Sequence, residues 1–142
     1  MTRVALVTGE ILADRRNFLS MRGGDVYRNA VARMAGAARH VLEGAGLTVD
    51  DVDLFVGHQA NIRILDAVGL RLGMPKERTH VTVDQHANTS AASIPLALED
   101  ARSAGRLTPG ATVLLAGFGA GLTWGACLLT WDPGAATDGD AP

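Results

Sequence analysis

The sequence has one cysteine, few aromatic residues and no long apolar run, and each shortage excludes a class of protein. A single cysteine among 142 residues rules out an internal disulfide framework and predicts a reducing, cytoplasmic location. No apolar run approaches the roughly 18 residues that a membrane helix needs. The net charge is −2 and Lys and Arg do not cluster, so the chain lacks the electrostatic footprint of a nucleic-acid-binding protein.

What the chain does contain is enough for one domain, because 142 residues can bury about 70% of their unfolded surface. Short apolar runs predict strands at residues 3–8, 54–56, 80–83, 112–116 and 124–131. Helical periodicity predicts helices at residues 25–43, 61–72 and 91–103. We expect residues 11–20 to form a loop or a weak strand, and the Pro-, Gly- and Asp-rich tail 132–142 to be disordered beyond a domain at 1–131.

This order of elements predicts an α/β fold with a mostly parallel sheet, because strands joined through helices run parallel with right-handed crossovers. The last two predicted strands are too close in sequence for a crossover helix. They must therefore pair antiparallel, which adds one antiparallel strand to the sheet.

Two polar residues follow consecutive predicted strands. His58 comes just after residues 54–56, and Asn88 lies in the loop after residues 80–83. Alone, each has an ordinary explanation, as a hydrogen-bonding strand-end histidine and as a turn former. Because parallel strands end at the same side of a sheet, however, the two could converge on one oxygen that gains negative charge in a reaction.

A glycine-rich segment, residues 117–121, follows the next predicted strand. Its spacing is superficially that of a dinucleotide-binding loop, but such a loop must open a helix, and here a strand follows. Two readings stay open: a backbone that offers N–H groups to a ligand, as an oxyanion hole does, and a plain hairpin turn.

The sequence context of the remaining cysteine, histidine and arginine side chains favours structural or surface roles. Cys127 lies in mid-strand with no helix N-terminus or strand-end elbow to activate the thiol, which predicts a packed core thiol. His40 and His80 have no metal-ligand spacing, and His86 is expected at a loop surface, so we expect no metal site. Arg63 is either a solvated side chain or one that faces a phosphate or an acid.

Taken together, the segments 57–63, 86–93 and 117–125 resemble the C-terminal half of β-ketoacyl-acyl carrier protein synthase III. This condensing enzyme starts bacterial fatty-acid synthesis, and related ketosynthases serve polyketide pathways. The resemblance runs from about residue 21 to residue 131. It implies one half of a thiolase-like fold, which in this family normally has two similar halves in one chain.

The resemblance also implies roles for individual residues. His58 and Asn88 would hold the malonyl thioester carbonyl while carbon dioxide leaves, and the backbone N–H of Ala120 would contribute to an oxyanion hole. Phe118 would lie beside the acyl entrance. Residues at the substrate and carrier-protein contact would be Gly23, Gln59, Ala60, Asn61, Ile62 and Arg63. Acyl-CoA and malonyl-acyl carrier protein would be substrates, and no cofactor is implied.

Three positions depart from the family pattern: Gly57 replaces the usual proline, Ala87 the usual glycine, and Gly24 a common polar residue that contacts coenzyme. The larger departure is the family's nucleophilic cysteine, which belongs to the N-terminal half and has no counterpart here. Since acyl transfer to a thiolate needs that nucleophile, we expect the chain to need a Cys-bearing partner and to form homo- or hetero-oligomers. The alternatives are a non-catalytic scaffold that keeps the fold, and an acyltransferase that works without decarboxylation.

Overall fold

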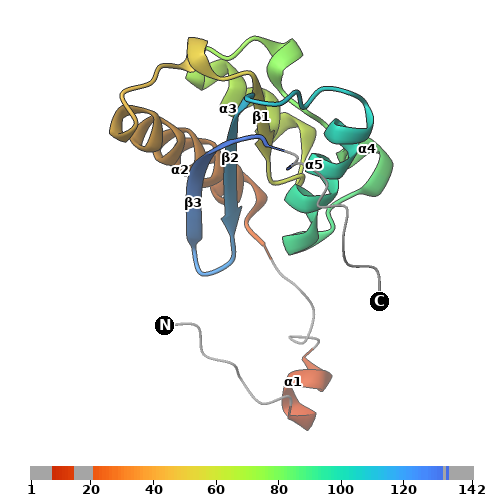
Figure 1. The fold of residues 1–142 in the computed structure, drawn as a ribbon. Coiled ribbons are helices and arrows are strands. Elements are labelled where there is room, and N and C mark those ends of the chain that lie inside the picture. The colour runs from red at the N-terminus through yellow and green to blue at the C-terminus, as the bar shows by residue number, and fades with distance from the viewer. Residues whose placement is uncertain (1–7, 15–20, 133, 135–142) are drawn as a thin grey trace.

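The computed structural model describes residues 8–14, 21–132 and 134 (Figure 1). Five α-helices and three strands make up this part of the chain. The helices are α1 (Gly9–Ala13), α2 (Gly23–Gly44), α3 (Ile62–Leu72), α4 (Val83–His86) and α5 (Ser93–Ser103). The strands are β1 (Leu54–Gly57), β2 (Thr112–Gly119) and β3 (Thr123–Thr130). Short 3-10 turns occupy Val49–Asp51, Lys76–Arg78 and Ser90–Ala92.

The strands form one mixed sheet in the order β1-β2-β3. Strands β1 and β2 are parallel, with Gly57 opposite Ala116. Strands β2 and β3 form an antiparallel hairpin, with Gly119 opposite Thr123. The predicted antiparallel closure is confirmed, and the carboxyl ends of β1 and β2 lie at the same end of the sheet.

Helices cover both faces of the sheet, and a hydrophobic cluster lies under each cover (Figure 1). On one face, α2 and α3 pack on Phe55 and Leu114, with the small residues Ala35 and Ala38 fully buried. On the other face, α5 packs through Ala97 and other side chains on β1 and the start of β2. The α/β class predicted from the sequence is confirmed.

The helix ends follow the sequence signals. The side-chain oxygen of Asn61 accepts a hydrogen bond from the N–H of Arg63 at 2.9 Å and so caps α3. Gly73 ends the same helix with a left-handed backbone (φ 80°). At the start of the helix, Ile62 is 44% exposed, whereas Ile64 packs into the core.

Two predictions about local structure are corrected. The predicted strand 80–83 is replaced by a single parallel bridge between Thr79 and Phe55, followed by the start of α4 at Val83. The predicted loop or weak strand 11–20 begins instead within helix α1, whose first turn is capped by Thr8. Most of the predicted strand 3–8 and most of the tail 132–142 lie outside the described residues.

Gly57 is the position of the sheet where any side chain would be costly. A Cβ atom there would lie 2.6 Å from Cδ2 of Leu65 and 3.0 Å from Cζ of Phe55, and both neighbours are fully buried. We expect Gly57→Ala to lower the free energy of unfolding by about 1–3 kcal/mol through overpacking. Gly36→Ala is the control, since its Cβ would meet nothing within 4 Å and should stabilise α2 by about 1 kcal/mol. Urea unfolding measures both, and equal effects would contradict the packing argument.

Candidate functional site

His58 is the first residue after β1, at the carboxyl end of the sheet. Its backbone N–H donates to the carbonyl of Ala116 at 2.8 Å, which fixes it beside β2. Its ring nitrogen Nδ1 lies 2.5 Å from Oγ of Ser93. The ring is half-buried, and burial lowers the pKa of His58 below its usual value. Burial therefore favours the uncharged imidazole, and its Nδ1 is engaged by Ser93.

Ser93 opens helix α5 and is only 2% exposed. Besides contacting His58, its Oγ accepts a hydrogen bond from the backbone N–H of Gln59 at 3.2 Å. The chain from Asn88 into α5 is thereby joined to the end of β1. Sequence reasoning missed this residue; the available signal was a small polar side chain at the start of a helix that packs on the sheet.

Gln59 lies inside the fold, with 1% of its surface exposed. Its Nε2 donates to the carbonyls of Gly57 (2.9 Å) and His80 (3.1 Å). Its Oε1 accepts from the N–H groups of Thr82 (2.8 Å) and Val83 (3.2 Å). The side chain expected at a carrier-protein contact therefore connects β1 to the segment that leads toward Asn88. Its four neighbours Ala60, Asn61, Ile62 and Arg63 remain at least partly exposed.

His80, at the start of the segment that leads to α4, is fixed by two side-chain contacts. Its Nε2 lies 2.8 Å from Oδ1 of Asp100, and its Nδ1 lies 2.9 Å from a guanidinium nitrogen of Arg106. A guanidinium can only donate, so Nδ1 accepts and Nε2–H donates to the carboxylate. With 4% of its surface exposed, His80 is a structural residue that ties the segment before α4 to α5.

Asn88 lies in an exposed loop between two residues of positive φ, Ala87 (55°) and Ser90 (55°). Its Oδ1 accepts a hydrogen bond from the N–H of Ser90 at 3.0 Å. Because the acceptor half of the carboxamide is bound within the loop, the NH₂ half is the end that can serve an external oxygen. The contact that the structure shows between this loop region and His58 runs through Ser93.

The glycine-rich segment continues β2 as far as Gly119 and turns at residues 120–122. Ala120 is exposed at this turn, four residues and about 13 Å of extended strand beyond Ala116. Phe118 is partly buried against the cluster under α2. Gly23 is exposed at the start of α2. His58 and Ala120 therefore lie at the same end of the sheet, but Ala120 is further out along the direction of β2.

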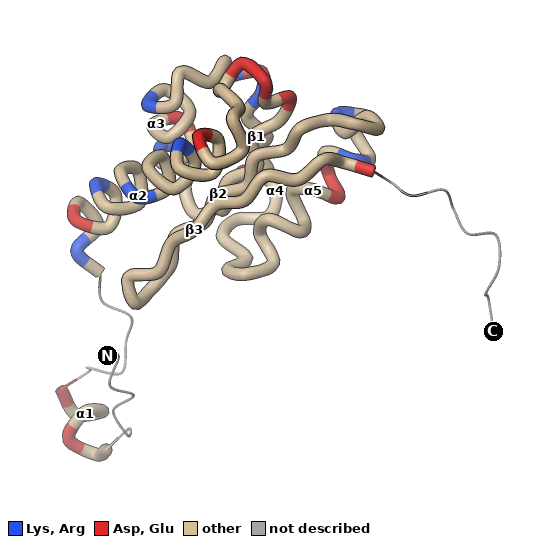
Figure 2. Tube along the Cα trace, turned by 60° about the vertical axis from the view of Figure 1, so that its left-hand side comes forward, with Lys and Arg blue, Asp and Glu red and all other residues tan. Residues whose placement is uncertain are grey.

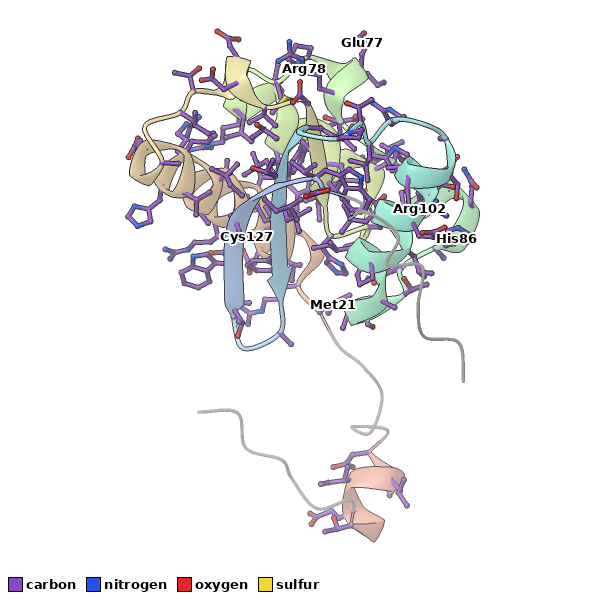
Figure 3. The ribbon with its side chains drawn as sticks, viewed as in Figure 1. Met21, Glu77, Arg78, His86, Arg102 and Cys127 are labelled. Carbon is purple, nitrogen blue, oxygen red and sulfur yellow. The ribbon has the colours of Figure 1, made fainter. Side chains whose placement is uncertain are left out.

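Cys127 is exposed, so the predicted core thiol is wrong (Figure 3). It pairs with Leu115, and both side chains face the side of the sheet that α5 covers. Helix α5 reaches β1 and the other end of the hairpin, where Leu129 packs, and leaves the middle of β3 open. His86 is exposed, as predicted, but it is the last residue of the short helix α4 rather than part of a loop (Figure 3).

Two surface hollows lie away from these loops. One, of about 490 Å³, runs between α2 and β3 and is lined by Arg33, His40 and Trp124 among others, with the Arg33 guanidinium 4.5 Å above the Trp124 ring. The other, of about 320 Å³, lies beside α3. Neither hollow is lined by His58 or Asn88.

Within the described ranges, no group of three or more His, Cys, Asp or Glu side chains is arranged to hold a metal ion. No helix in this part of the chain has the length and apolar character to cross a membrane.

Comparison with known proteins gives a consistent result. Residues 42–131 match the family described as 3-oxoacyl-[acyl-carrier-protein] synthase III C terminal. The chain is 56% identical over 112 residues to a β-ketoacyl-[acyl-carrier-protein] synthase III of Nitratidesulfovibrio vulgaris, covering 79% of this chain and 34% of the relative. It is 53% identical over 114 residues to the synthase III 2 of Streptomyces coelicolor, with 80% and 34% covered.

Solved structures agree with this assignment. The synthase III of Thermus thermophilus is similar with a TM-score of 0.80 and 54% identity, covering 83% of this chain and 37% of that one. A priming β-ketosynthase of a polyketide pathway is similar with a TM-score of 0.68 and 46% identity, covering 78% and 34%. The predicted half of a thiolase-like fold is confirmed. The chain spans about a third of the length of the curated relatives it matches.

Proposed function

This chain belongs to the 3-oxoacyl-[acyl-carrier-protein] synthase III family through its C-terminal domain, and on that premise we propose that it supplies two donors to a decarboxylating condensation site. In the proposal, His58 and Asn88 donate hydrogen bonds to the thioester carbonyl oxygen of malonyl-acyl carrier protein. The observation that carries it is the geometry of His58: a half-buried imidazole whose Nδ1 is occupied by Ser93, which leaves Nε2 for a substrate.

The chemistry requires donors at that oxygen. When the bond between the malonyl carboxylate and the α-carbon breaks, carbon dioxide leaves and the electron pair moves onto the thioester as an enolate. Preorganised N–H donors stabilise the negative oxygen, and removing one such donor typically costs about 3–4 kcal/mol of transition-state stabilisation. The enolate carbon then attacks an acyl thioester, whose sulfur departs as thiolate. The backbone N–H of Ala120 would serve the carbonyl oxygen of that second step.

The acyl thioester would be carried by a cysteine of the N-terminal half of the enzyme. Cys127 does not suit this role, because it lies in the middle of β3, where no hydrogen bond or ion pair to its thiol is found in the described part of the chain. Residues 107–131 contain no charged side chain, and the same holds for residues 87–98 (Figure 2). Exposed apolar side chains in these segments are Leu96, Leu122 and Trp124. An uncharged surface of this kind supports association with a second half.

Carrier protein would approach on the side of the α3 N-terminus. Asn61, Ile62 and Arg63 are exposed there, and arginine positions recur along α2 and α3 (Figure 2). Arg63 would face an acidic or phosphorylated partner, and Gly23 and Phe118 would lie along the path of the acyl chain. Acyl-CoA and malonyl-acyl carrier protein are substrates in this proposal, no cofactor is required, and the reaction would take place in the cytoplasm.

The decisive experiment measures carbon dioxide release from carboxyl-labelled malonyl-acyl carrier protein. We expect the chain alone to be inactive and the chain mixed with a Cys-bearing N-terminal half to release carbon dioxide and form the β-ketoacyl product. Binding to that half without release would instead support a scaffold. Acyl product formed without carbon dioxide would support an acyltransferase, and either result would overturn the decarboxylation proposal.

A further inference from the structure

We propose that Ser93 is a positioning residue that sets the tautomer of His58, holding the proton on Nε2 so that the ring presents an N–H to the substrate side. The catalytic meaning of this role rests on the function proposed above for His58. The structural role stands on two contacts of one hydroxyl, to Nδ1 of His58 at 2.5 Å and to the N–H of Gln59 at 3.2 Å.

Counting protons decides which group donates. The Ser93 hydroxyl has one proton and two lone pairs, and the N–H of Gln59 already occupies one lone pair. If Nδ1 carried the ring proton, it would occupy the second lone pair, and the hydroxyl proton would need a further acceptor. No further hydrogen bond of this hydroxyl, to a side chain or to the backbone, is found among the described residues. Because Ser93 is 2% exposed, a hydroxyl proton without an acceptor would be a buried, unsatisfied donor, which disfavours this arrangement.

The arrangement in which Ser93 donates to Nδ1 satisfies every group. Nδ1 then accepts, and the single proton of the neutral ring lies on Nε2. A donor at Nε2 is the species that stabilises an oxyanion, whereas a bare Nε2 lone pair would repel it. Ser93 thus sets the tautomer through Nδ1, whereas the substrate would bind at Nε2 on the opposite side of the ring.

Helix α5 keeps this hydroxyl in place. Ser93 is its first residue, and Ala97 and Ala101 of the same helix are fully buried against Leu54 and Val56 of β1. The strand that ends at His58 and the helix that carries Ser93 therefore move as one packed unit. A hydroxyl on a rigid helix fixes a ring better than one on a loop would.

Nitrogen NMR of the isolated chain tests the proposal without any partner. Two-bond ¹⁵N–¹H correlation at pH 7.5 should show His58 as the Nε2–H tautomer. Ser93→Ala should raise the Nδ1–H population several-fold, and Ser93→Thr, which keeps the hydroxyl, should retain the original tautomer. Ser103→Ala, at the other end of α5, is the matched control and should change nothing. An Nδ1–H ring in the unmodified chain, or no change in Ser93→Ala with a native backbone spectrum, would overturn the proposal.

The assay of the assembled enzyme separates this inference from the proposed function. Ser93→Ala should lower kcat for decarboxylation at least tenfold with little change in KM, since a wrong histidine tautomer can cost up to about 10⁴-fold in a catalytic triad. If the tautomer shifts as expected but the unmodified assembly releases no carbon dioxide, the proposed function fails and the structural role of Ser93 stands. If decarboxylation occurs but Ser93→Ala leaves both tautomer and kcat unchanged, only the inference about Ser93 fails.

Discussion

His58→Ala is expected to lower decarboxylation by the assembled enzyme by about 10²–10³-fold, because it removes one preorganised donor from an oxygen that becomes negative. The ring is the proposed donor, and its place is fixed by Ser93 at Nδ1 and by Ala116 at the backbone. The loss should appear in kcat at saturating malonyl-acyl carrier protein, since the interaction strengthens only in the transition state. Initial rates of labelled carbon dioxide release measure it.

His40→Ala is the matched control for this variant. His40 is exposed on α2 and lines the hollow beside β3, away from the polar loops. We expect its removal to leave kcat unchanged. Urea unfolding of both variants shows whether a lost rate reflects lost structure. A His58→Ala assembly that matches the His40→Ala assembly in kcat would refute the donor role.

Much of the fold could be predicted because its signals are local. Helix α3 illustrates this: an asparagine cap, a run of apolar residues at helical spacing and a terminal glycine all lie within thirteen residues, and the structure follows them at both ends. The hairpin of β2 and β3 was equally accessible, because a short connection leaves two strands only the antiparallel pairing.

The segment 80–83 shows why other predictions failed. Its β-branched residues favour a strand, yet the N–H groups of Thr82 and Val83 are taken by the carboxamide of Gln59 rather than by a neighbouring strand. Gln59 is more than twenty residues away along the sequence, so no local sequence pattern predicts this contact. The exposure of Cys127 was equally out of reach, because it depends on how far α5 extends over the sheet.

The same distance argument applies to the candidate site. His58 and Asn88 could be selected because each is a reactive residue after a predicted strand. Sequence reasoning gives no role to Ser93 and places Gln59 only at a carrier-protein contact. Their structural roles rest on contacts that span 34 or more positions for Ser93 and mostly 21 or more for Gln59. Residue type identifies candidate donors, whereas the residues that orient them emerge only from the packed structure.

Gln59→Ala is expected to cost the largest amount of stability, about 3–4 kcal/mol in the free energy of unfolding. The truncation leaves the N–H groups of Thr82 and Val83 and the carbonyls of Gly57 and His80 without their side-chain partner. Each buried group left unpaired costs about 1–3 kcal/mol, and relaxation or entering water recovers part of the total. Urea unfolding followed by circular dichroism measures the change. Faster hydrogen exchange of the amide protons of Thr82 and Val83 should show that the lost stability comes from the 80–83 segment.

Gln85→Ala separates the effect of burial from that of residue type. Gln85 is an exposed glutamine in α4, only two residues beyond Val83, and its truncation should change stability by less than about 0.5 kcal/mol. If Gln59→Ala lowered the free energy of unfolding no more than Gln85→Ala does, water would replace the Gln59 carboxamide at no loss. The carboxamide would then not be the group that fixes the 80–83 segment. If the expected difference is found, Gln59 stabilises the 80–83 segment that leads to the Asn88 loop. A weaker condensation activity of Gln59→Ala would then follow from a displaced Asn88 loop rather than from a lost contact with carrier protein.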